Sequence, residues 1–283
     1  MRTMGFSLII ASAFSLGAAC LHPPRDYPGK LGSKVQEYLF FKSGQDIHMV
    51  MNQQVQSTLP LPKEFAWVTP LPALPSKYFQ EKDEMFETLF RATEPVMKSR
   101  SIASLSADRF IVHDTVHVGN YEIIPIEITD VHAGAEINQW LAKNGYAEVP
   151  VAGLRYYLKP KACFLAIKVK GMSGVEKVLH PLHVVYRADE ARLPLKFFAN
   201  AGSFQVYVYV RNRGSAPVAQ AGLKNAGILE NGWLIPDKAI FDKLALNAFA
   251  SDTGSIQRFF GPKLNDKDHK LSDWKEDPLL LLD

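Results

Sequence analysis

Five of the eight histidines are the side chains here best suited to metal binding or acid–base chemistry. His113 and His117 lie four residues apart in a predicted strand, so they share a face but sit about 13 Å apart along it. His180 and His183, three residues apart, point to opposite faces unless a bulge intervenes. Zinc needs three or four convergent ligands. A metal site among these residues and His132 therefore requires tertiary convergence, and hydrogen-bonded sheet or surface histidines are the simpler interpretation.

Common sequence motifs for catalysis do not occur. The sequence contains no G-x-x-x-x-G-K or G-x-G-x-x-G loop, which excludes nucleotide binding by these devices. Residues 171–174 approach the G-x-S-x-G nucleophile elbow but place glycine one position too early, so we expect a turn there. Cys163 shares a predicted strand face with apolar residues, which favours a buried structural thiol over a nucleophile. We expect no cofactor.

The predicted strand from Phe204 to Arg211 alternates clearly between apolar and polar side chains. Its polar face carries Tyr207, Tyr209 and Arg211 and continues to Arg213. Such a ladder of aromatic and guanidinium groups can bind carbohydrate, anions or a partner protein. A solvated outer sheet face explains the same pattern, because amphipathic side chains commonly cover such faces.

The N-terminal residues predict export. An apolar run from Gly5 to Leu16 is followed by small side chains, which is typical of a cleavable secretion signal over residues 1–19. The run is too short to span a bilayer. Gly17 and Ala19 satisfy the small-x-small rule for ordinary cleavage before Cys20. Lipidation of Cys20 is the alternative, and glycine in place of the usual aliphatic residue three positions earlier weighs against it.

Composition favours one folded domain. The chain has 283 residues, of which 47% are hydrophobic and 22% charged. Its net charge of +3 is spread along the chain, which argues against a nucleic-acid partner. Two cysteines cannot supply a disulfide framework. We expect an irregular lead-in over 20–33, a single domain over 34–260 and a loosely held polar tail over 261–283, although Leu279 to Leu282 could dock in a groove.

Periodicity predicts more strands than helices. Helices are expected around Met85 to Phe90 and Ile137 to Leu141, and a third near Pro236. Trp67 and Trp140 fall on apolar faces and are predicted core residues. Because the helices lie between hairpins, the fold class is predicted to be α+β with a mainly antiparallel sheet, with a β-sandwich as the alternative. The predicted strands are 35–41, 46–52, 64–69, 109–118, 121–128, 162–170, 179–187 and 204–211.

These segments resemble a family of bacterial exported proteins, domain-of-unknown-function family 2330 (DUF2330). The resemblance spans about residues 34 to 213 and implies export and a shared fold. It implies no activity and no catalytic residues. Many relatives carry two cysteines at the start of the mature chain, whereas this sequence keeps only Cys20. The similar stretches are 63–72, 121–123, 140–141, 144–146, 163–170, 180–182, 193–195 and 206–210.

Export and the lack of a catalytic motif favour a non-catalytic cell-envelope or secreted binding module. Its partner would be an envelope protein or a glycan, and it would contact a membrane only through a lipid on Cys20. The alternative is an extracytoplasmic hydrolase or metalloenzyme whose site forms only by tertiary convergence.

Overall fold

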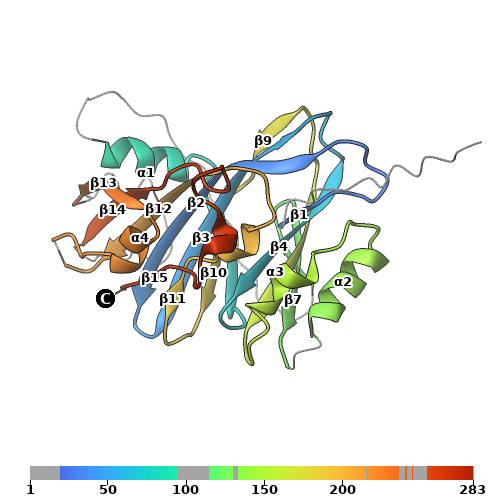
Figure 1. Ribbon diagram of the computed structural model, residues 1–283. Coiled ribbons are helices and arrows are strands. Elements are labelled where there is room, and N and C mark those ends of the chain that lie inside the picture. Colours follow the sequence, from blue (N-terminus) through green and yellow to red (C-terminus); the bar gives the residue numbers. More distant parts are fainter. Residues whose placement is uncertain are drawn as a thin grey trace, which may run out of the picture.

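Two β-sheets form the body of the protein (Figure 1). The computed structural model describes residues 20–94, 115–129, 133–214, 216–235, 240, 244 and 254–282. The smaller sheet has five strands in the order β1-β4-β8-β7-β6, all antiparallel. Its strands are β1 (Leu21–His22), β4 (Glu64–Leu71), β6 (Val116–Val118), β7 (Tyr121–Glu127) and β8 (Cys163–Lys170).

The larger sheet has eight strands in the order β13-β14-β12-β2-β3-β10-β5, with β9 also paired to β3. Its pairings are antiparallel except for the parallel pair β12 and β2. The predicted α+β class with a mainly antiparallel sheet is therefore confirmed. The strands are β2 (Leu31–Ser43), β3 (Asp46–Ser57), β5 (Lys77–Gln80), β9 (Glu176–Val178), β10 (Leu182–Tyr186), β12 (Gln205–Asn212), β13 (Leu229–Leu234) and β14 (Ser255–Phe260).

The two sheets share one apolar core. Side chains from one face of the larger sheet, such as Phe40 and Val208, belong to the same buried cluster as Phe65 and Ile167 of the smaller sheet. The opposite face of the larger sheet packs against α1 in a second cluster. The helices are α1 (Met85–Thr93), α2 (Ala133–Lys143), α3 (Val151–Arg155) and α4 (Ala221–Asn225), with 3-10 turns η1 (Leu195–Phe198) and η2 (Leu271–Asp273).

Two predicted turns depend on glycine. Gly119 joins β6 to β7 with φ +58°, and Gly145 follows the end of α2 with φ +78°. An L side chain is strained at such angles, which is why glycine ends these elements. The expected strand near 109–118 is described only from residue 115, and only residues 240 and 244 of the helix expected near Pro236 are described, both helical.

Both predicted irregular ends are more ordered than expected. In the lead-in, β1 pairs with β4, and β2 already begins at Leu31. At the other end, β15 (Leu279–Leu280) pairs with β11 (Ala191–Arg192), and Leu271 and Leu280 are buried. The tail is docked because isolated apolar side chains and backbone pairing hold it, and neither produces a periodic sequence signal.

The two predicted core tryptophans differ in burial. Trp67 is 1% exposed, which confirms the prediction. Trp140 is only half-buried, because α2 docks mainly through the fully buried Ile137 and Leu141 while the Trp140 ring leans on Tyr146. Replacing Trp140 should therefore cost less stability than full burial would imply.

Candidate functional site

The histidines predicted from the sequence do not converge on one point. His117 is exposed, and His180 is half-buried beside the carboxylate of Asp83. His183 is buried. His113 and His132 lie outside the described residues. Within the described part of the chain, no group of three or more histidine, cysteine, aspartate or glutamate side chains has the arrangement needed to hold a metal ion.

His183 instead belongs to a buried triad with Glu81 and His48. The Glu81 Oε1 and His183 Nδ1 atoms lie 2.6 Å apart, and His183 Nε2 lies 2.9 Å from His48 Nδ1. Burial lowers the pKa of His183 to about 3. The pKa of His48 is also lowered to about 3, by burial and by the neighbouring His183 ring. Burial raises the pKa of Glu81 to about 8. Sequence spacing singled out His183 but could not predict its partners, because the three members come from β3, β10 and the residue after β5.

The predicted polar face of β12 is largely covered. Tyr209 is fully buried against Phe86 of α1, and Arg211 is only 5% exposed. Tyr207 is half-buried beside the Phe90 ring, while Arg213 is exposed. The four residues therefore do not form one solvated ladder. The helix α1 covers this face because Phe86 and its apolar neighbours need burial, and tyrosine supplies a large apolar ring beneath its hydroxyl.

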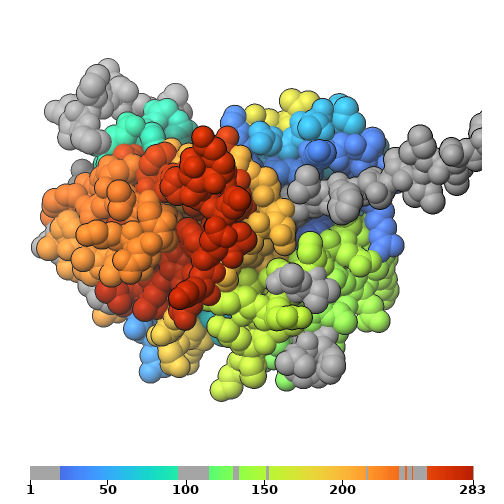
Figure 2. Space-filling view, viewed as in Figure 1, coloured from blue at the N-terminus to red at the C-terminus, as the bar shows by residue number. Residues whose placement is uncertain are grey.

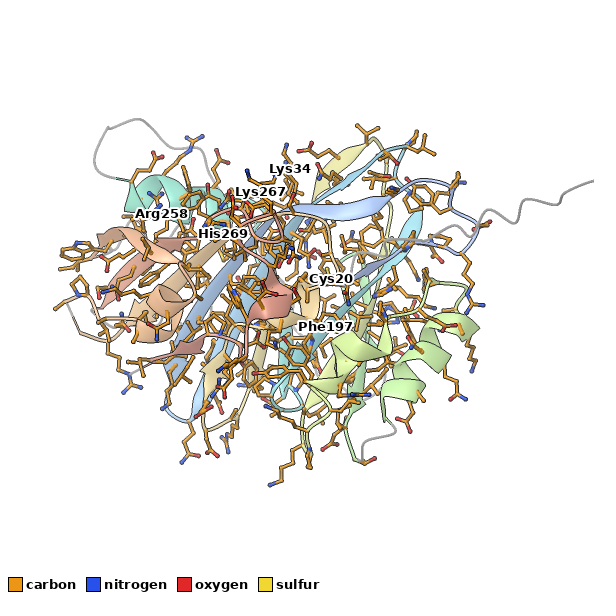
Figure 3. All side chains as sticks on the ribbon, viewed as in Figure 1. Cys20, Lys34, Phe197, Arg258, Lys267 and His269 are labelled. Carbon is orange, nitrogen blue, oxygen red and sulfur yellow. The ribbon has the colours of Figure 1, made fainter. Side chains whose placement is uncertain are left out.

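Both cysteines lie in the core. Cys20 is fully buried, and its Sγ lies 3.8 Å from the side-chain oxygen of Gln53 (Figure 3). Burial raises the pKa of the Cys20 thiol far above its ordinary value. The Cys163 thiol is also fully buried, as expected, and burial raises its pKa to about 12. In both residues burial disfavours the thiolate, which is the form that nucleophilic attack requires.

A hollow of about 370 Å³ opens beside the C-terminal segment, of which residues 274–279 line it, next to α4 and β15. Figure 2 shows this segment running across the surface alongside the residues that precede β13. The lining combines an indole, small apolar groups, and amide, guanidinium, ammonium and carboxylate groups. The lining residues are Arg192, Gly222, Asn225, Ala226, Trp274, Lys275, Glu276, Asp277, Pro278 and Leu279.

The wall between α4 and β15 depends on a close backbone approach. A Cβ atom on Gly222 would lie 2.2 Å from the carbonyl oxygen of Leu279, so only glycine fits there. Just before α4, the buried Gln220 side chain donates to the Leu281 carbonyl and accepts from the Leu281 N–H, each at 2.9 Å. These contacts fix the C-terminal strand against α4.

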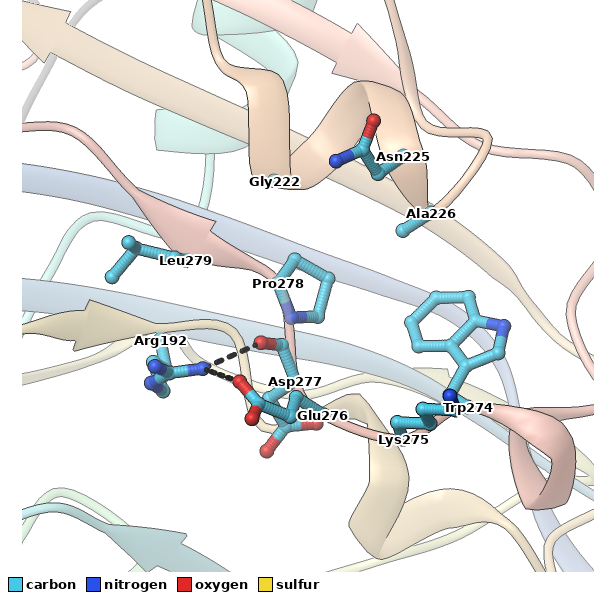
Figure 4. Close-up of a pocket in the computed structure, with 10 residues that line it drawn as sticks. All are labelled: Arg192, Gly222, Asn225, Ala226, Trp274, Lys275, Glu276, Asp277, Pro278 and Leu279. Carbon is cyan, nitrogen blue, oxygen red and sulfur yellow. Dashed lines mark hydrogen bonds and ion pairs between the residues drawn. The ribbon is translucent and has the colours of Figure 1, made fainter.

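Arg192 of β11 forms the opposite wall (Figure 4). Its guanidinium donates to the Glu276 carboxylate at 3.0 Å and to the Asp277 carbonyl at 3.2 Å. A second carboxylate, from Glu190, lies 2.8 Å away. The guanidinium is thus held in one orientation while its side chain stays 30% exposed. Held donors of this kind lose little entropy when they bind an acceptor.

Beneath the hollow, Asp277 anchors the segment to the core. Its carboxylate accepts from the Tyr157 hydroxyl at 2.6 Å and from the Lys196 backbone N–H at 2.8 Å. Burial raises the pKa of Asp277 to about 6, against these hydrogen bonds, which lower it. The Lys196 ammonium donates to the Trp274 carbonyl, which fixes the backbone that carries the indole.

The arrangement suits the binding of a small molecule. The half-buried indole of Trp274 lies on one side and Arg192 on the other, with Pro278 between them (Figure 4). Pockets of about 300–1,000 Å³ with apolar walls and a few fixed polar groups are typical of small-molecule sites. The hollow could not be predicted from the sequence, because Trp274 is an isolated aromatic residue in a charged stretch. The apolar run from Leu279 to Leu282 suggested docking but not a hollow.

Comparisons with known proteins add little. No family model matches the sequence, and no curated protein matches it. Among solved structures, the chain is similar to the crystal structure of baculovirus P35, with 10% identity, 91% of this chain and 87% of that chain covered, and a TM-score of 0.40. So distant a likeness says nothing about function. The resemblance to family 2330 stays a prediction.

Proposed function

We propose that the protein is an exported, non-catalytic binding module that takes a saccharide in the hollow beside β15. The observation that carries this proposal is the combination of the Trp274 indole with fixed polar groups in one hollow of about 370 Å³. This volume lies within the range of about 300–1,000 Å³ that is typical of small-molecule pockets.

A saccharide matches the lining in two ways. Sugar rings present C–H groups on their flat faces, which pack against an indole, while their hydroxyls both donate and accept hydrogen bonds. The Asn225 amide can donate and accept, the Lys275 ammonium can donate, and the Glu276 carboxylate can accept. A purely apolar ligand would leave these groups without partners.

Burial of Cys20 supports release from the membrane. A diacylglyceryl group on this sulfur would need the side chain to leave the core, where it is fully buried. Export itself rests on the predicted signal over residues 1–19. No helix among the described residues is long and apolar enough to cross a membrane. Mass spectrometry of the mature N-terminus checks this point, because a lipid on Cys20 would contradict release.

Saccharide titration of the mature protein tests the proposal. The probes are hexoses, N-acetylhexosamines, uronic acids and their short oligomers, and binding is followed by calorimetry. Trp274→Ala should weaken binding at least tenfold, because it removes the stacking surface. Asn225→Ala tests the polar wall with an exposed residue whose loss should not disturb folding. Trp233→Ala is the matched control, because that indole is 47% exposed on β13 and does not line the hollow. Saccharide binding that is absent, or unchanged in both Trp274→Ala and Asn225→Ala, would contradict the proposal.

A further inference from the structure

We infer that the buried triad of Glu81, His183 and His48 is an acid-sensitive contact that holds α1 and the segment leading into it against the larger sheet. The triad includes none of the residues that line the saccharide hollow. It is nevertheless built from three buried titratable side chains, of which His48 is the most exposed at 8%. Such groups are seldom buried without a structural or functional demand.

The position of the triad links an edge strand to a helix. β5 pairs with β10 over only four residues and stands at the edge of the eight-stranded sheet. Glu81 follows β5 directly, and its N–H donates to the Pro181 carbonyl at 3.0 Å. The helix α1 begins at Met85. The Glu81 side chain therefore fixes the short connection through which α1 is attached.

Ring packing encloses the histidines. The His48 ring stacks on Phe41, with centroids 4.4 Å apart and planes 13° apart. His183 packs against Phe79 and Phe41, at 5.2 Å and 5.9 Å between centroids. The same sheet face carries the apolar cluster that α1 covers, and the buried side of α1 contributes Met85, Phe86, Leu89 and Thr93.

The number of hydrogens between the two imidazole rings explains why acid disfavours the contact between His183 and His48. The contact between His183 Nε2 and His48 Nδ1 has room for one hydrogen, donated by one ring and accepted by the other. If both imidazoles become cations, both nitrogens carry hydrogens, and the two N–H groups face each other across 2.9 Å. The contact can therefore persist with at most one charged histidine. Two protonated histidines require the rings to separate.

Neighbouring charges also disfavour the cations. Lys77 of β5 and Arg211 of β12 act on His48 to disfavour its charged form, and Asp46 at the start of β3 opposes them. Lys82 favours the ionised form of Glu81. The described inward face of α1 contributes no carboxylate that could offset a second cation. Acidification thus favours a state in which the rings part and α1 is released from the cluster.

Exchange of backbone amides with deuterium tests the inference in the full mature protein. The readout is exchange in residues 77–93, corrected for intrinsic rates, from pH 7 to pH 4.5. Glu81 releases a proton on opening and so offsets part of the histidine effect. The comparison is therefore made with the double variant His48→Gln/His183→Gln, whose amides still donate and accept but do not titrate. The opening ratio, wild type over variant, should rise by up to about tenfold per pH unit for each histidine, below about pH 6.5.

Two controls separate this mechanism from general acid loosening. His180→Gln removes the neighbouring pair with Asp83 and should keep the wild-type acid response. Histidine ring resonances of the wild-type protein should change over the same pH range as the α1 amides, which tests the inference even if the double variant fails to fold. A ratio constant within about twofold, an acid response lost in His180→Gln, or ring resonances that titrate without α1 opening would each overturn the inference.

Discussion

The two faces of the eight-stranded sheet are built from the same strands but hold very different side chains. On β12, Val206 and Val208 belong to the core shared with the smaller sheet, whereas Tyr209 packs against Phe86 of α1 and Arg211 shares the face of Tyr209. Both faces are buried. The first is mainly apolar, and its buried polar side chains include the uncharged amides Gln36, Gln53, Asn212 and Gln257, whereas the second also holds charged groups such as Arg258. Apolar side chains need only shape and volume, whereas polar and charged groups also need matched partners.

Matched partners on the second face come from remote segments. Arg258 is 5% exposed, and its guanidinium donates to the Phe90 carbonyl near the end of α1 and to the Asn231 side chain, each at 3.0 Å. It also lies over the Phe90 ring at 4.6 Å. The first face has partners of this kind as well, but between uncharged amides, as where the Asn212 amide donates to the Gln257 side-chain oxygen at 2.8 Å. We therefore expect packing changes to dominate on one face, and loss of partners or changes of charge on the other.

The largest expected effect is a cavity on the first face. Phe40→Ala removes a fully buried ring from the core between the sheets and should cost about 3–5 kcal/mol of unfolding free energy. Urea denaturation at pH 7 measures this loss. A loss below about 1 kcal/mol would show that the two sheets do not depend on each other for packing.

Next comes Arg258→Met on the second face. The substitution keeps much of the apolar stem but removes the donors to Phe90 and Asn231, so it should cost about 2–4 kcal/mol. Exchange of α1 amides should increase as well. Arg91→Met is the matched control, because Arg91 lies on α1 itself and its side chain is 62% exposed. Equal effects of the two substitutions would mean that Arg258 does not hold α1.

The contrast between the faces also explains which features the sequence could predict. Alternation located β12 and placed its valines correctly, because apolar side chains at period two have one stable environment. The same alternation suggested that Tyr209 and Arg211 were solvated. Both are buried, and Tyr209 packs against Phe86 of α1, which is distant in sequence, so no local pattern could predict that contact.

Single side chains explain the other missed features. Asp277 looked like part of a charged tail, yet Tyr157 and Lys196 hold it in the core. No functional role was predicted for Glu81 or His48, because neither residue belongs to a sequence motif. The saccharide hollow and the triad are both assembled from segments far apart in the chain, so spacing in the sequence could not reveal them.

The third prediction concerns charge on the second face. Burial raises the pKa of Glu81 to about 8 from its ordinary 4.5. Its stability contribution is therefore fully present below about pH 4.5 and is lost as pH rises through 8. Glu81→Gln cannot titrate, and its amide can donate to His183 as the protonated carboxyl does. Relative to this variant, wild type should lose up to about 1.4 kcal/mol per pH unit between about pH 5 and 8. Urea denaturation at several pH values measures the difference, and a flat difference would place an ionised carboxylate in the triad.

The smallest effect is expected where the second face leaves a polar atom unmatched. The Tyr209 hydroxyl is buried and finds no hydrogen-bond partner among the described residues. Tyr209→Phe keeps the ring against Phe86 and removes only this oxygen, so it should leave stability unchanged or raise it by about 1 kcal/mol. Tyr157→Phe provides the matched comparison, because that hydroxyl donates to Asp277 and its loss leaves a buried carboxylate with one partner fewer. Thermal and urea unfolding of both variants should therefore give opposite signs, or at least a difference of about 1–3 kcal/mol. If Tyr209→Phe were the more damaging change, the hydroxyl would have a partner, and the second face would be fully matched.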